Sequence, residues 1–130
     1  MSELSGGLES FFAAETARPE VQVVVSERFR GEDGQALAWR LQPVTAEDMQ
    51  RLWAAGNADG GSGLVLRLLA RAVVYPDLQD AALQDSYGVL GAEELLLRML
   101  SPGEYGVLLA AFEKQNLRPE MPELVRDAKN

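Results

Sequence analysis

Two runs of alternating apolar and polar residues constrain the fold of this chain most, because they cannot form a stable structure alone. Apolar residues recur at nearly every second position in residues 21–29 and 36–41, which is the period of a strand with one buried face. The apolar faces consist of Val21, Val23, Val25, Phe29, Leu37, Trp39 and Leu41. The turn-forming residues 31–34 join the runs and predict an antiparallel β-hairpin over residues 21–42. Two strands are marginally stable in water, so the hairpin must pack on other elements.

The rest of the chain predicts helices that can supply this packing surface. Thr45 is suited to an N-cap and begins the first of them. Met49, Leu52 and Trp53 would share one face of this helix, which ends at the glycine-rich residues 56–63. That stretch lacks the lysine of a phosphate-binding loop and follows a helix instead of a strand, so we interpret it as a linker.

A second predicted helix covers residues 64–75, which are apolar nearly all round. Arg67 and Arg71 interrupt the pattern at i, i+4 spacing and would form one thin solvent-facing stripe. Pro76 ends the helix. We therefore expect this segment to lie at the centre of the core.

Further helices follow, each with a start or stop signal. Asp80 can cap one that ends before Gly88, and Glu93 lies at the start of the next. Ser101 and Glu104, on either side of a proline, have the spacing of a capping box. The buried stripe of that last helix would consist of Tyr105, Leu108, Leu109 and Phe112.

These patterns predict an α+β, mostly helical fold in which one N-terminal antiparallel β-hairpin packs on a bundle of about five helices. Residues 1–20 would form an N-terminal segment with a short helix over residues 8–14. Residues 21–116 would form a single globular domain, with the hairpin at 21–42 and the helices at 45–116. Residues 117–130 would form a C-terminal tail.

The sequence argues against an enzyme because it contains neither cysteine nor histidine. Thiolate chemistry, imidazole catalysis and zinc fingers are excluded on that ground. Lys114 and Lys129 are the only lysines, and neither has the apolar setting that a nucleophilic lysine needs. The clustered carboxylates of residues 77–94 fall at expected helix starts and lack the spacing of a calcium loop. We expect no catalytic residue, no cofactor and no metal site.

The net charge and the hydropathy pattern limit the classes of partner that the protein could bind. A net charge of -8 disfavours nucleic acid and anionic membranes. The sequence has no signal peptide pattern and no run of about 18 apolar residues. We expect the protein to stay in the cytoplasm and to act by binding another protein through an exposed apolar surface.

Particular segments of the sequence carry a family resemblance. In the second half they are residues 75–88, which include Pro76-Asp77-Leu78 and Leu83-Gln84-Asp85-Ser86-Tyr87-Gly88, and then residues 91–96 and 99–105. In the first half they are Val25-Ser26-Glu27-Arg28-Phe29, Asp33-Gly34, Trp39 and Pro43-Val44-Thr45. From about Phe11 to Asn116 the sequence thereby resembles the tail assembly chaperones of tailed phages and prophages. It departs from them in residues 59–63 and 119–130.

The resemblance implies a non-enzymatic protein of the host bacterial cytoplasm that is absent from the mature virion. It would bind the tape measure protein transiently and help tail tube subunits polymerise around it. Such chaperones are often made in two lengths by ribosomal frameshifting, so a longer form of the chain itself is a further implied partner. Codons GCA-AAA-AAC for residues 128–130 would provide the slippery heptamer. The sequence does not indicate an oligomeric state.

Two other functions stay open at this point, a permanent tail or virion component and an acidic adaptor or secretion chaperone outside phage biology. For each function the candidate partner-binding residues are Arg67, Arg71, Leu117, Met121, Leu124 and Val125. The alternative for each of them is intramolecular packing or a solvated surface.

Overall fold

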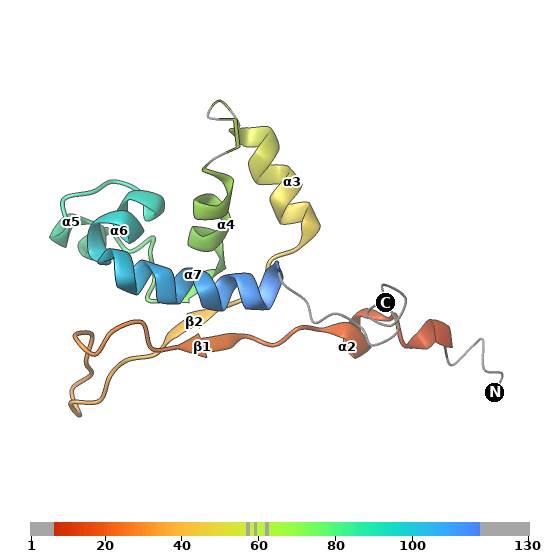
Figure 1. Ribbon diagram of the computed structural model, residues 1–130, viewed down its shortest axis with the longest axis horizontal. Helices are drawn as coiled ribbons and strands as arrows, with labels where there is room; N and C mark the ends of the chain where they lie inside the picture. The colour runs from red at the N-terminus through yellow and green to blue at the C-terminus, as the bar shows by residue number, and fades with distance from the viewer. Residues whose placement is uncertain (1–6, 57, 59, 62, 118–130) are drawn as a thin grey trace, which may run out of the picture.

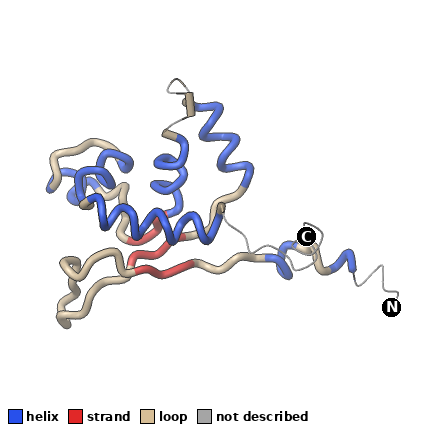
Figure 2. The backbone as a smooth tube through the Cα atoms, in the orientation of Figure 1, coloured by secondary structure: helices blue, strands red, loops and turns tan. Residues whose placement is uncertain are grey.

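The computed structural model describes residues 7–56, 58, 60, 61 and 63–117. A small antiparallel sheet forms one layer, and the helices cover one of its faces (Figures 1 and 2). The strands are β1 (Val21–Val23), β2 (Trp39–Leu41) and β3 (Val73–Tyr75). The helices are α2 (Ala13–Thr16), α3 (Ala46–Ala55), α4 (Leu64–Ala72), α5 (Ala81–Ser86), α6 (Ala92–Met99) and α7 (Pro102–Asn116). The mixed, mostly helical class predicted from the sequence is confirmed.

The predicted pairing of the two alternating runs is also confirmed, although the strands are shorter than the runs. β1 pairs antiparallel with β2, and Val21 lies opposite Leu41. Trp39 and Leu41 are buried while Arg40 between them is exposed, as the period of two requires. Outside the paired strands, a single bridge between Arg30 and Ala36 closes the turn.

The sheet has a third strand, which corrects the prediction that the β structure consists of one two-stranded hairpin. β3 pairs antiparallel with β2, with Val73 opposite Leu41. The predicted helix over residues 64–75 therefore ends at Ala72, three residues early. Val73 and Val74 are β-branched, a class that packs well on a pleated surface, and β2 offers them a pairing edge. Tertiary pairing thus overrides the helical pattern at this end.

The N-terminal segment contains short helical pieces, as predicted, but they do not form one helix over residues 8–14. The structure has a helical turn at residues 7–9 and the separate short helix α2, with an extended backbone at Phe12 between them. No residue of α2 is buried. Such a short segment lacks the tertiary packing that stabilises most helices in proteins.

The core lies between the sheet and the helices α4, α6 and α7. Its largest fully buried side chains are Trp39, Phe112, Leu41, Leu69, Leu78, Leu95, Leu96 and Leu108. Helix α4 contacts α3, α6, α7 and β3, so its predicted central position is confirmed. The buried stripe of α7 holds Leu108 and Phe112.

Side-chain caps fix where the helices begin. Ser101 and Glu104 form the predicted capping box of α7, in which the Glu104 carboxylate accepts from the Ser101 N–H at 2.8 Å. Thr45 is the predicted N-cap of α3, and Asp80 caps α5. These local signals were readable because each needs only residues close in sequence.

One ion pair joins the two halves of the chain that carry the family resemblance. The Arg28 guanidinium donates to both oxygens of Glu104, with Nε and Nη2 each at 2.7 Å from the carboxylate. The same guanidinium lies 4.4 Å from the centre of the Phe29 ring and donates to the carbonyl of Met99. The segments at residues 25–29 and 99–105, which carry the family resemblance, are thus held against one another. Their structural role is to form this contact.

Candidate partner-binding surface

Helix α3 is attached to the body of the protein by a polar anchor at Asp48 and by Leu52, which packs against the core. Asp48 is its only buried residue. The Asp48 carboxylate accepts from the Arg71 Nε at 2.9 Å, and Arg51 lies 3.5 Å from the same oxygen. Because an amphipathic helix usually buries its apolar stripe, it is unusual that no apolar residue of α3 is fully buried.

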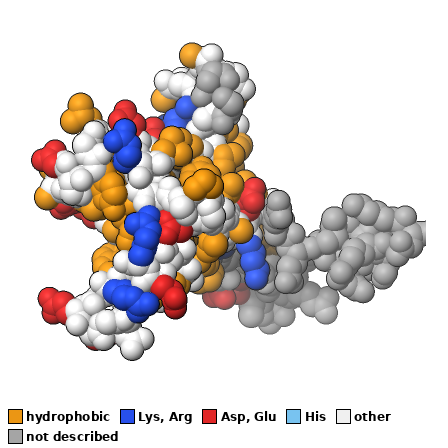
Figure 3. All heavy atoms as spheres, turned by 60° about the vertical axis from the view of Figure 1, so that its left-hand side comes forward, with side chains coloured by type: hydrophobic (Ala, Val, Ile, Leu, Met, Phe, Trp, Pro, Cys, Tyr) orange, Lys and Arg blue, Asp and Glu red, His pale blue; other side chains and the backbone are white. Residues whose placement is uncertain are grey.

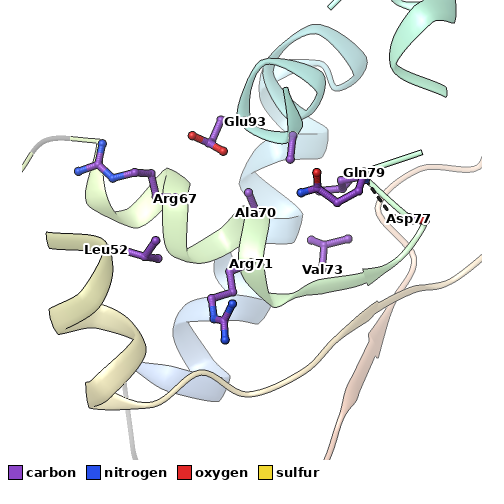
Figure 4. Close-up of a pocket in the computed structure, with 10 residues that line it drawn as sticks. Leu52, Arg67, Ala70, Arg71, Val73, Asp77, Gln79 and Glu93 are labelled. Carbon is purple, nitrogen blue, oxygen red and sulfur yellow. Dashed lines mark hydrogen bonds between the residues drawn. The ribbon is translucent and has the colours of Figure 1, made fainter. Parts of the chain in front are cut away.

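The two arginines predicted as candidate partner contacts both project from α4 toward α3. Arg71 pairs with Asp48 near the start of α3, and Arg67 donates to the carbonyl of Gly56 at its end. Figure 4 shows their guanidinium groups pointing apart, toward opposite ends of α3. The sequence predicts that these residues form a thin solvent-facing stripe. In the structure both make intramolecular hydrogen bonds that anchor α3.

A groove with a volume of about 310 Å³ opens beside these anchors (Figure 4). Its lining comes from α3, α4, β3, the segment after β3 and the start of α6, and consists of Leu52, Arg67, Ala70, Arg71, Val73, Asp77, Leu78, Gln79, Ala92 and Glu93. Arginines and carboxylates both line it, together with aliphatic side chains. This composition suits contact with a peptide segment that carries apolar and polar groups. Among the described residues, no group of three or more acidic, cysteine or histidine side chains could hold a metal ion.

The apolar face of α3 is partly exposed to solvent. Met49 is 36% exposed and Trp53 is 40% exposed, while Leu52 is half-buried. We call Met49 and Trp53 the α3 stripe. Their i, i+4 spacing places both side chains on one face of α3. Other apolar side chains are scattered among charged ones over the surface (Figure 3).

The glycine-rich segment after α3 supports one end of this stripe. A Cβ added to Gly61 would lie 2.1 Å from a ring carbon of Trp53, and the Gly61 φ of +84° is one that other residues rarely adopt. Gly61 is therefore required for the indole to lie against the loop. The segment serves to connect α3 to α4 and to receive Trp53.

Of the other sequence-predicted candidates, the structure describes Leu117 alone. Leu117 follows the end of α7 and is 45% exposed. Met121, Leu124 and Val125 lie outside the described residues. A role for these four in partner binding stays a prediction.

Asp48 is the residue that sequence reasoning missed as the anchor of this region. The sequence showed it only as an acidic residue in a first helical turn, where it interacts with the helix dipole. Its Thr45-x-x-Asp48 spacing is a signal for a reciprocal cap, and that capping box is present. The partner Arg71 is 23 residues away in sequence, and nothing local could have identified it.

Two carboxylates are held in their charged form by their contacts. The Thr45 backbone N–H, with help from the Thr45 hydroxyl and Arg71, lowers the pKa of Asp48. Hydrogen bonds from Arg28, and then from the Ser101 N–H, strongly lower the pKa of Glu104. Both groups therefore bind protons more readily in the unfolded chain than in the folded one.

These pKa shifts predict a loss of stability in acid. Since ordinary Asp and Glu pKa values are near 4, the contribution of both groups is complete above about pH 4 and is lost as the pH falls below it. We expect urea unfolding midpoints to fall with pH in that range, and to fall less steeply in Asp48→Asn. Asp85→Asn, which removes an exposed carboxylate, is the matched control and should follow the original chain. Equal slopes for Asp48→Asn and the original chain would contradict the anchoring role.

Comparison with known proteins places this chain in a family. Residues 8–129 match the family model described as "Phage XkdN-like tail assembly chaperone protein, TAC". The chain is 27% identical over 125 residues to the phage-like element PBSX protein XkdN of Bacillus subtilis (strain 168), covering 85% of this chain and 84% of that protein. Its fold is similar to the crystal structure of the protein yqbn, with a TM-score of 0.71, 24% identity and coverage of 81% of this chain and 91% of that one. No helix in the described part of the chain is long and apolar enough to span a membrane.

Proposed function

Because this chain belongs to the family of XkdN-like phage tail assembly chaperones, we propose that it binds the tape measure protein transiently during tail assembly. Binding would occur before and while tail tube subunits polymerise around the tape measure protein. The chaperone would act in the host bacterial cytoplasm, would not catalyse a reaction and would leave before the virion matures. A frameshifted longer form of the same chain would be a further participant.

The exposed α3 stripe is the observation that supports this proposal most. A tape measure protein presents long apolar helices before the tube encloses them, and such helices bind other helices through residues spaced at i, i+3 and i+4. Met49 and Trp53 offer that spacing at 36% and 40% exposure. Arg67 and Arg71 would act by holding α3 in place, and the neighbouring groove would take polar groups that flank the apolar contact.

The charge and small size of this surface suit reversible binding. A net charge of -8 would make loaded complexes repel one another and would limit aggregation. Two large side chains give modest affinity at one site, whereas many copies along a long target together provide coverage. Tube subunits could then displace the copies one at a time.

The direct test is binding to tape measure segments. Purified chain is titrated by calorimetry into apolar helical fragments of the tape measure protein from the same phage or prophage. The proposal predicts saturable binding with a negative heat-capacity change, because apolar surface is buried. Absence of binding to every fragment would contradict it. Mass spectrometry of purified virions separates a chaperone from a permanent tail component, since only the latter would be found at fixed stoichiometry.

A further inference from the structure

The N-terminal arm, residues 7–16, exposes three large apolar side chains. Leu8 is 64% exposed, Phe11 is 79% exposed and Phe12 is 54% exposed. These three side chains lie close together in the sequence, on the first part of the arm. Clustered exposed side chains of this size indicate an interaction surface.

The base of the arm is fixed, and it directs the arm away from the body (Figure 1). The Arg18 guanidinium donates to the Gln115 carbonyl at 3.3 Å, to the Asn116 Oδ1 at 3.2 Å and to the Val44 carbonyl. Pro19 restricts the residue before it to extended conformations. Because the anchor lies directly before the first strand, the arm leaves the body extended and does not fold back on it.

A groove with a volume of about 370 Å³ lies at this anchor, between β1 and α7. We call it the β1–α7 groove, and it is lined by Arg18, Pro19, Val21, Ala111, Lys114 and Gln115. Apart from Gln115, its uncharged lining residues are apolar. Its two charged lining residues, Arg18 and Lys114, are both basic. Neither forms an ion pair with a carboxylate among the described residues.

The arm has the opposite charge. Glu9 and Glu15 are the only charged residues between positions 7 and 16, so the arm carries two negative charges and no positive one. An apolar, acidic segment therefore exists in the same molecule as an apolar, basic groove. Each feature is complementary to the other in both hydropathy and charge.

We propose that the arm of one copy docks in the β1–α7 groove of a second copy. The two phenyl rings would cover the apolar floor of the groove, and the two glutamates would face Arg18 and Lys114. The arm does not reach the groove of its own chain, because it starts at that groove and points away from it. A contact between an arm and a different surface is heterologous, so copies join head to tail. The inference depends on the arm and the groove alone, and not on binding of a tape measure protein.

Sedimentation velocity over a wide range of protein concentration tests this inference. The original chain is expected to form larger species as the concentration rises. Phe11→Ser with Phe12→Ser, and separately Lys114→Glu, should each weaken self-association by about tenfold or more. Leu90→Ser removes another large side chain, one that is 92% exposed, and is the matched control that should associate like the original chain. Circular dichroism melting verifies that each variant is folded.

Mixing the two types of variant distinguishes the head-to-tail contact from any other. The double phenylalanine variant keeps an intact groove, and the Lys114→Glu variant keeps an intact arm. Their mixture should form one-to-one pairs that do not grow further. A monomeric original chain at all concentrations, association unchanged by the arm variant, or loss through the arm variant but not through Lys114→Glu would each overturn the proposal.

Discussion

Replacement of Met49 and Trp53 together by serine is expected to weaken binding to tape measure fragments by roughly fiftyfold to hundredfold. If both side chains are covered in the complex, their loss removes about 2 to 3 kcal/mol of apolar burial. The capping box at Thr45 and the Asp48–Arg71 ion pair are untouched, so α3 should remain in place. Calorimetric titration of the variant against the same fragments measures the effect.

The controls for this prediction separate the α3 stripe from apolar surface in general. Leu90→Ser with Leu97→Ser removes two side chains that are 92% and 58% exposed, and it should leave the affinity unchanged. Met49→Ser alone leaves the contact between Trp53 and Gly61 intact, and it should still weaken binding by about tenfold. Equal losses in the control and in the stripe variant would contradict the assignment of the surface to α3.

The largest expected effect on stability comes from Phe112→Ala. Phe112 is fully buried in α7, and it is among the largest side chains of the core. Truncating such a residue leaves a cavity and should lower the free energy of unfolding by about 3 to 5 kcal/mol. That is a large part of the total for a small domain, so the midpoint of urea unfolding should fall sharply.

A phenylalanine-to-alanine substitution on the N-terminal arm serves as the matched control. Phe11 is 79% exposed, and Phe11→Ala should change the free energy of unfolding by less than about 0.5 kcal/mol. Measurements at low protein concentration keep self-association from adding to the apparent stability. Similar losses in the two variants would show that the core described around α7 is wrong.

The sequence predicted those parts of the fold that depend on neighbouring residues. The Ser101–Glu104 capping box, the Asp80 cap and the alternation around Trp39 all need contacts within a few positions, and all are present. The end of α4 was predicted three residues late, because pairing of Val73 with Leu41 is set by the assembled sheet. Local patterns could not reveal a strand that exists only through a distant partner.

The candidate site was predicted less well, for the same physical reason. Arg67 and Arg71 were identified as unusual on an apolar helix, but their anchoring of α3 depends on Gly56 and Asp48. The apolar face of α3 was readable as a stripe, whereas its exposure was not. Whether a stripe is buried depends on what the rest of the chain places against it, and here the described residues leave Met49 and Trp53 partly uncovered.

Light scattering of an aggregating tape measure fragment tests the central claim most directly. The fragment is diluted from denaturant into buffer alone, with the original chain, or with the Met49→Ser and Trp53→Ser double variant. We predict that the original chain suppresses the rise in scattering in proportion to its concentration and that the double variant does not. Aggregation at the same rate in all three samples would contradict the account.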